Sequence, residues 1–366
     1  RLSAAGAPAL PACAKKEEAA PADAATAQAP AALELKLDES SLPGVNRFQI
    51  GDLDTTKSAC TDFAGYANGK WLAANAIPSD RTSWGAFEML AERSTAVQKQ
   101  LAEQAAAMPN ASGVEKIVGD LWATGMDEAK INAQGIEPIK PLLTAIDGLQ
   151  DKDAIVAYLN DSAAKGQAFL FGFGAEADFN KPDTNFAYAF QGGLGLPDKN
   201  FYFDADKKDI RDGYVAHIAK VLELSGVPAA DAAKQAGDIL AFETRLAKVS
   251  KSNEEMSRDV SLYYNPVTLA EADKLTPNFS WTKFFESQGV APQEKFSLAV
   301  PAFHQEVSKM LGDTDPSAWR SYLRFHTIDG ASPYLSDAFA NEHFNFYRQT
   351  LPGQKELPTR CQRVLG

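Results

Sequence analysis

The residues of this chain best suited to metal binding or acid–base chemistry are its four histidines, His217, His304, His326 and His343. Two imidazoles on a helix reach one zinc ion when they stand four residues apart, as in H-E-x-x-H, where the glutamate acts as base beside the bound water. No two histidines of this sequence have that spacing. Isolated histidines beside apolar residues, such as His304 after Phe303, are typical of packed or surface positions. The sequence therefore predicts no catalytic residue and no metal ligand.

Nucleophilic catalysis has equally little support. The chain contains no G-x-S-x-G elbow, and neither Cys60 nor Cys361 has a histidine near it in sequence. The three cysteines show no C-x-x-C spacing, so Cys60 and Cys361 are expected to be free thiols. The acidic residues within 204–209 and at 254–255 are expected to lie on solvated faces.

A glycine-containing run, Gly-Leu-Gly-Leu-Pro-Asp at residues 193–198, invites comparison with phosphate-binding loops. A dinucleotide-binding loop needs the full G-x-G-x-x-G pattern, and here Leu196, Pro197 and Asp198 follow the second glycine. The run is therefore interpreted as a structural turn, and the sequence predicts no cofactor-binding residue.

Composition limits the partners of the chain. With 36 Lys plus Arg against 48 Asp plus Glu, its net charge of −12 disfavours nucleic acids and anionic membrane surfaces. Its 366 residues, 45% hydrophobic and 23% charged, are typical of a soluble globular protein with a core. No stretch approaches the ~18 apolar residues of a membrane-spanning helix. Membrane association is expected only through an anchor.

The N-terminal segment offers such an anchor. Residues 1–45 are rich in Ala, Pro and Glu without apolar periodicity, which predicts a disordered signal or tether segment. Small residues leading to Leu10-Pro11-Ala12-Cys13 are similar to a bacterial lipoprotein signal, which makes Cys13 a candidate lipidation site and predicts a periplasmic or membrane-anchored lipoprotein of the cell envelope. The alternative is a lone cysteine in a disordered leader.

Residues 46–366 are expected to form one mainly α-helical domain. Amphipathic periodicity predicts helices from Ser83, from Val114, and over 210–224 and 229–249. Further helices are expected over 281–286, 301–311 and 317–325, and Thr268 is a predicted N-cap. Alternating aromatic residues in 168–174 and 185–190 predict two short strands, bounded by Lys181-Pro182-Asp183, in a small hairpin.

An aromatic-rich stretch precedes the first long helix. Residues 62–72 read D-F-x-x-Y-x-N-G-x-W-L, and residues 77–87 read I-P-x(5)-W-G-x-F. Phe63, Tyr66 and Trp71 suit one buried face, and Asn68-Gly69 suits a tight bend. We therefore expect an entry segment anchored in a core on both sides.

These two blocks resemble the start of the neprilysin and endothelin-converting-enzyme family of zinc metallopeptidases. The Gly193–Asp198 run, the Tyr263-Tyr264-Asn265-Pro266 turn and the closing segment from Tyr322 to Glu356 resemble the family in the same order. The resemblance extends from about residue 46 to the end of the chain. It implies a mainly α, neprilysin-type cap domain with a small β-hairpin, and a thermolysin-like catalytic half that this chain lacks.

The resemblance also implies a function. In the family, this half covers the catalytic half and forms a chamber that admits oligopeptides, which are hydrolysed by zinc-activated water. The zinc ligands belong to the other half, so this chain is expected to be the non-catalytic portion of a zinc metalloendopeptidase. Half of such an interlocked fold is expected to expose apolar surface. The alternative is a tethered periplasmic helical protein that binds peptides without catalysis.

Two positions depart from the family pattern. Residues 360–363 read Arg-Cys-Gln-Arg, where the family commonly has an aromatic residue after the first arginine. Ser83 stands where animal members place an arginine that binds the substrate carboxylate. No substrate-anchoring arginine is therefore assigned.

Overall fold

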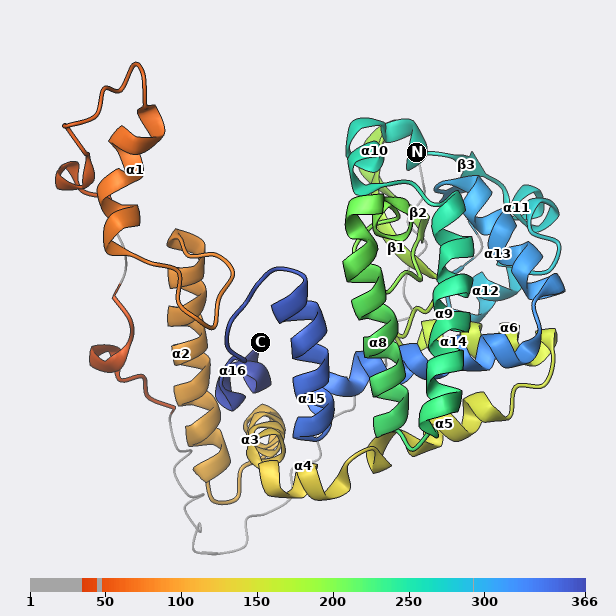
Figure 1. Cartoon of the computed structure of the whole chain (residues 1–366), viewed down its shortest axis with the longest axis horizontal. Helices are drawn as coiled ribbons and strands as arrows, with labels where there is room; N and C mark the ends of the chain where they lie inside the picture. The colour runs from red at the N-terminus through yellow and green to blue at the C-terminus, as the bar shows by residue number, and fades with distance from the viewer. Residues whose placement is uncertain (1–34, 45–47, 292) are drawn as a thin grey trace, which may run out of the picture. The chain divides into compact units, whose positions relative to one another are not determined.

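A computed structural model describes residues 35–44, 48–291 and 293–366 (Figure 1). Leu37–Gly366 form the compact unit described below. Cys13 and most of the predicted tether lie outside the described residues, so both stay predictions. Among the residues that the structure describes, no helix has the length and apolar character needed to span a membrane.

The compact unit is mainly helical, as the sequence predicted. Its α-helices are α1 (Phe63–Ala74), α2 (Ala86–Ala107), α3 (Gly113–Met126), α4 (Glu128–Gln134), α5 (Lys140–Asp147), α6 (Lys152–Ala164), α7 (Asn200–Phe203), α8 (Lys208–Leu224), α9 (Ala229–Val249), α10 (Asn253–Arg258), α11 (Leu269–Leu275), α12 (Trp281–Ser287), α13 (Pro301–Asp313), α14 (Pro316–Ala331), α15 (Asp337–Phe344) and α16 (Arg360–Leu365). Short 3-10 turns are η1 (Glu39–Ser41), η2 (Ile50–Asp52), η3 (Glu137–Ile139), η4 (Ala205–Lys207), η5 (Val260–Leu262) and η6 (Ser332–Tyr334), and η7 (Asn345–Thr350) is a π-helical segment.

Side-chain caps explain where several helices begin. Thr268 caps α11 as predicted, and Glu271 completes the capping box by accepting from the Thr268 backbone N–H. Thr359 and Gln362 form the same arrangement at the start of α16. Helices α8 and α9 have no side-chain cap, so their predicted starts depended on apolar periodicity.

The sheet is larger than the predicted hairpin. Strands β1 (Phe171–Asp178) and β2 (Lys181–Gln191) are antiparallel, and β4 (Phe296–Leu298) and β3 (Pro266–Val267) extend the sheet in the order β1-β2-β4-β3. The expectation that Lys181-Pro182-Asp183 bound the strands is wrong, because β2 begins at Lys181. The turn lies at Phe179-Asn180, where Asp178 Oδ1 accepts from the Asn180 N–H at 2.8 Å.

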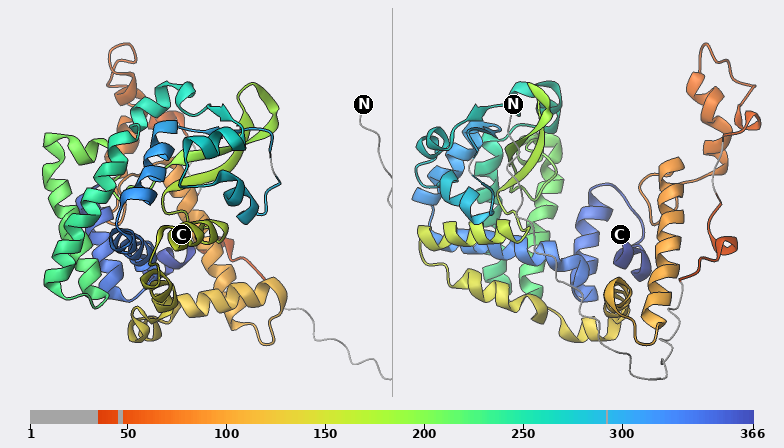
Figure 2. Two further views of the ribbon diagram at one scale, coloured as in Figure 1. Left: turned by 90° about the vertical axis from the view of Figure 1, so that its right-hand side faces the viewer. Right: turned by 180° about the vertical axis from the view of Figure 1, so that it is seen from behind.

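Two apolar clusters form the core, and α9 and α14 contribute to both. The first packs the sheet against α12 and α13 with fully buried aromatic side chains such as Trp281, Phe303 and Trp319. The second lies between α5, α8, α9, α14 and α15. Helices α8 and α9 run side by side along this body, as the views of Figure 2 also show. Within the described residues, neither cluster includes a side chain from α1, α2 or α3.

The entry segment differs from its prediction. Instead of a bend at Asn68-Gly69, α1 runs unbroken through both residues and buries none of its side chains, with Phe63 67% exposed. The Asp62 carboxylate caps the helix by accepting from the Gly65 N–H at 2.9 Å. Capping by Asp62 and the alanines that follow favour the helix, and each of its two glycines costs only about 1 kcal/mol.

A C-terminal segment of the chain contacts the linker between α1 and α2. Gln354 Nε2 donates to the Asp80 carbonyl at 3.1 Å, and the Lys355 N–H donates to the Ser79 carbonyl at 3.1 Å. Gln362 Nε2 then donates to Asp80 Oδ2 at 3.2 Å. Residues 354–362 therefore connect the α1–α2 linker to α16, which packs on α2 and α3.

Gly119 sets the close approach of α2 and α3. A Cβ at this position would lie 2.8 Å from the Ala105 carbonyl oxygen, a backbone atom that cannot rotate away. We expect Gly119→Ala to destabilise the chain by about 1–3 kcal/mol through this overlap, despite the better helix propensity of alanine. Urea unfolding measures the change.

Gly237→Ala in α9 is the matched control. No atom lies within 4 Å of its added Cβ, so the same substitution is expected to stabilise the chain by about 0.5–1 kcal/mol. Equal effects of the two substitutions would contradict a packing role for Gly119.

Candidate functional site

Helix α3 has an apolar stripe that faces solvent. Val114, Ile117, Val118 and Leu121 recur at spacings of three and four residues, which places them on one helix face. Their exposed fractions are 71%, 68%, 36% and 65%. The other face of α3 buries Trp122 and packs Gly119 against α2. A helix that is apolar on two faces, with one open, is typical of a protein–protein contact.

Helices α1 and α2 continue this feature. Phe87 and Leu90, one helical turn apart on α2, are 86% and 53% exposed, and Leu72 on α1 is 60% exposed. Soluble proteins seldom leave several large apolar side chains in water without a binding function. Large apolar side chains are therefore exposed on α1, α2 and α3.

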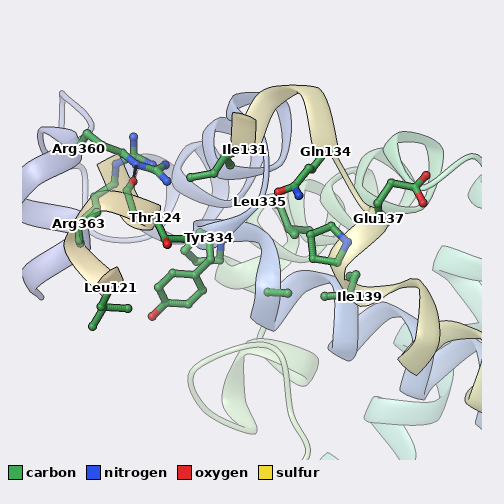
Figure 3. Close-up of a pocket in the computed structure, with 16 residues that line it drawn as sticks. Leu121, Thr124, Ile131, Gln134, Glu137, Ile139, Tyr334, Leu335, Arg360 and Arg363 are labelled. Carbon is green, nitrogen blue, oxygen red and sulfur yellow. Dashed lines mark hydrogen bonds between the residues drawn. The ribbon is translucent and has the colours of Figure 1, made fainter. Parts of the chain in front are cut away.

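A pocket of about 700 Å³ opens beside the α3 stripe, between α3, α4, η3, η6 and α16. Its walls are mostly apolar and include Leu121, Ile131, Ile139, Leu335 and Val364. Leu121 belongs to both the stripe and the pocket. Figure 3 shows Arg360 and Arg363 at one end beside Thr124, with Glu137 and Ile139 at the other.

The two arginines of the pocket differ in their contacts. Arg360 Nε donates to the Gly125 carbonyl at 2.7 Å, which ties α16 to the end of α3. Nε and Nη1 of Arg363 are both buried and have no hydrogen-bond partner within the described ranges. Burial and the neighbouring Arg360 lower the pKa of the Arg363 guanidinium, although arginine stays charged at any physiological pH. The pocket therefore combines apolar walls with an unsatisfied positive group.

Each histidine is held by contacts within the fold. His304 lies beneath the sheet, where Nε2 donates to the Ala189 carbonyl at 3.3 Å, and burial lowers its pKa to about 4. His326 Nε2 donates to Glu243 Oε1 at 2.8 Å. His343 Nδ1 lies 3.2 Å from Asp329 Oδ1.

His217 bridges two carboxylates on different helices. Its Nδ1 lies 2.9 Å from Glu342 Oε1 and its Nε2 lies 3.0 Å from Asp329 Oδ1. Carboxylates only accept, so the contacts favour the imidazolium form. Burial alone lowers the pKa of His217, but the two hydrogen bonds outweigh it and leave the pKa above its ordinary value. Burial opposes charge on Asp329 as well, yet hydrogen bonds from His217 and His343 hold its pKa well below the usual range.

Glu243 has a structural role that the sequence did not predict. Its carboxylate is fully buried and accepts from Tyr202 at 2.6 Å, Tyr214 at 2.9 Å, the Gly195 N–H at 3.2 Å and His326. Burial and the Glu243 charge raise the pKa of Tyr202 and keep its hydroxyl a donor. The available signal was a charged residue on the apolar stripe of α9.

The Gly193–Asp198 run has a structural role in this network. A Cβ at Gly195 would stand 1.8 Å from the Tyr214 hydroxyl oxygen, so only glycine lets this backbone reach Glu243. The run lies between β2 and α7 and forms a turn, as the sequence predicted.

The remaining candidate residues are not among those that line the pocket. Cys60 is exposed and Cys361 is half-buried, and both are free thiols. The acidic residues at 204, 206 and 209 are exposed, as predicted, whereas Glu255 caps α10 and has its pKa lowered to about 2, chiefly by hydrogen bonding with the Ser252 backbone.

The described residues do not fit a catalytic zinc ion. No group of three or more His, Cys, Asp or Glu side chains in the described ranges is arranged to hold a metal. The imidazoles face carboxylates or a backbone carbonyl rather than converging on one point. That the chain has no metal ligand and no catalytic residue stays a prediction from its sequence.

Comparison with known proteins gives one consistent result. The model of Peptidase family M13 matches residues 59–366. Mouse endothelin-converting enzyme 1 is 28% identical over 315 residues, which cover 81% of this chain and 40% of the mouse protein. Human endothelin-converting enzyme-like 1 is 27% identical over 336 residues, which cover 87% of this chain and 43% of that protein. The chain thus spans about two fifths of the length of these relatives.

Solved structures agree with this fold. The zinc metalloprotease Zmp1 of Mycobacterium tuberculosis, in complex with an inhibitor, superposes with a TM-score of 0.78 at 29% identity. The match covers 87% of this chain and 49% of that chain. PepO from Lactobacillus rhamnosis gives a TM-score of 0.72 at 21% identity over 85% of this chain and 49% of that chain, which supports the fold alone.

The buried His304 makes a stability contribution that depends on pH. Its pKa is about 4 in the folded chain against 6.5 as the ordinary value, so its contribution is complete above pH 6.5 and is lost as the pH falls toward 4. The shift corresponds to about 3 kcal/mol. We expect His304→Phe to remove this loss between pH 6.5 and 4, as measured by urea unfolding across that range.

The phenylalanine leaves the Ala189 carbonyl satisfied, because the Ala299 N–H also donates to it at 3.0 Å. An unchanged pH dependence in the variant would show that other groups control acid unfolding.

Proposed function

Because the chain belongs to peptidase family M13, we propose that it is the helical, chamber-forming half of a zinc metalloendopeptidase that hydrolyses oligopeptides. The proposal assigns the zinc ion, the general base and the hydrolytic step to a separate catalytic half, as the family resemblance implies. The residues of this chain would cover the catalytic half, limit access of folded proteins and exclude bulk water from the chamber. The proposed location is the periplasm or the bacterial cell envelope, with Cys13 as the lipid attachment site.

The open apolar stripe of α3 carries this proposal. Ile117 and Leu121 are each about two thirds exposed, at 68% and 65%. Full burial of such a side chain contributes about 1.5–3 kcal/mol, so the stripe supplies enough free energy to bind a partner domain. The other face of α3 is already used by α2. A partner that packs on the stripe would make α3 a central element of a larger fold.

A catalysis-free peptide-binding protein is the second candidate. The apolar pocket beside α16 favours it, because its volume of about 700 Å³ falls within the ~300–1,000 Å³ typical of ligand sites. The two candidates differ in whether a zinc-binding half associates with the chain.

Replacing two apolar residues of the stripe is expected to reduce apolar exposure without unfolding the chain. We expect Ile117→Ser with Leu121→Ser to lower binding of an apolar fluorescent dye and to reduce self-association in light scattering, because two exposed apolar side chains are lost. Far-UV circular dichroism should keep its helical signal.

The matched control is Glu115→Ser with Asp120→Ser, which places the same residue at two exposed polar sites of α3. Equal dye binding by wild type, variant and control would contradict the assignment of the stripe as an association surface.

Association with a catalytic half tests the proposal directly. The chain alone is expected not to hydrolyse peptides, whereas co-expression with the H-E-x-x-H-containing half of an M13 peptidase should give a co-purifying complex with chelator-sensitive hydrolysis of short peptides. The stripe variant should weaken that complex about tenfold or more, given ~1–2 kcal/mol lost per side chain. Chelator-sensitive hydrolysis by the chain alone would overturn the division of labour.

A further inference from the structure

The Arg363 guanidinium lacks partners that its position demands. Among the residues that the structure describes, buried Nε and Nη1 have no acceptor, although a guanidinium is always charged and can only donate. Buried donors without acceptors are rare in proteins, and an ion or ligand commonly explains them. Each of these atoms shares an edge of the guanidinium with Nη2, and such an edge has the fork geometry that matches a carboxylate.

Nearby charged groups of the described residues do not pair with the Arg363 guanidinium. Arg360 adds a second positive charge and has its Nε committed to the Gly125 carbonyl. Asp337 and Glu128 act on Arg363 only at long range, and the Asp337 carboxylate instead accepts from Asn132 Nδ2 at 2.7 Å. The pocket end is therefore electropositive and without a counter-charge in contact.

The rest of the pocket selects what carries the negative charge. Leu121, Ile131 and Leu335 give apolar walls to a cavity of about 700 Å³, which suits an apolar side chain next to the charged group (Figure 3). A free inorganic anion would leave these walls wet. Leu121 also lies on the open stripe of α3, so one partner can cover both features.

We infer that this pocket is an anchoring site for an apolar segment that carries a carboxylate, and that the catalytic half supplies it. The carboxylate pairs with the Arg363 guanidinium, and the adjoining apolar side chain fills the cavity. The choice of partner rests on the proposed function, whereas the carboxylate specificity rests on the pocket alone.

The first experiment probes the pocket with the chain by itself. Isothermal titration with N-acetyl-L-leucine and with its neutral amide, N-acetyl-L-leucinamide, compares one apolar group with and without the carboxylate. We expect the acid to bind at least about tenfold more tightly to the wild-type chain, as charge-assisted hydrogen bonds to a buried guanidinium require. Arg363→Met should abolish the difference.

Arg258→Met is the matched control, since Arg258 is exposed on α10 and pairs with Glu254 of the same helix. The control should keep the preference for the acid. Equal binding of acid and amide by the wild-type chain would overturn the inference.

The second experiment separates anchoring from folding. Because Arg363 has unpaired buried donors, Arg363→Met should leave the melting temperature of the isolated chain unchanged or higher. The same variant should weaken association with the catalytic half at least about tenfold, while Arg258→Met should not. A lowered melting temperature with unchanged association would overturn the inference and assign Arg363 a structural role.

The outcomes distinguish the two proposals. If the catalytic half binds wild type and Arg363→Met equally, the anchoring site is overturned and the proposed function stands. If the catalytic half does not bind the wild-type chain, the proposed function and the choice of partner fail, and the acid–amide comparison still decides the carboxylate specificity.

Discussion

A single buried carboxylate organises the helical body. Glu243 is completely removed from water, and an ionised carboxylate in that position is tolerated only when donors surround it. The donors come from α7, α8, α14 and the glycine turn that follows β2. The need to satisfy one charge therefore fixes the relative positions of elements that are distant in sequence. The close approach of Gly195 to Tyr214 is one result of that need.

The sequence allowed prediction of the long helices and of the family, but not of the site. Helices α8 and α9 have sustained apolar periodicity, so propensity and packing agree. Strands β3 and β4 contain two and three residues, which is too short for any periodic signal. They form through tertiary pairing, β4 with β2 and β3 with β4. The aromatic residues of α1 were expected to be buried within this chain, but α1 buries none of its side chains. Aromatic character favours burial but gives no information about which partner covers the side chain.

The pocket illustrates the same limit more strongly. Its walls come from α3, α4, η3, η6 and α16. No local sequence pattern predicts that these segments come together. Residues 360–363 were noted only as a departure from the family pattern. In the structure, Arg360 and Arg363 of this stretch form the charged end of the cavity. Only the tertiary structure shows that two buried donors of Arg363 lack acceptors among the described residues.

The contact between the C-terminal segment and the α1–α2 linker affects the order in which the chain folds. Gln354 and Asp80 are 274 residues apart, and the entropy cost of closing a loop rises with its length. During synthesis, α2 and α3 emerge well before α16, which packs on them. The faces of α2 and α3 that α16 covers therefore stay in contact with water or with a chaperone until residues 360–365 have been made.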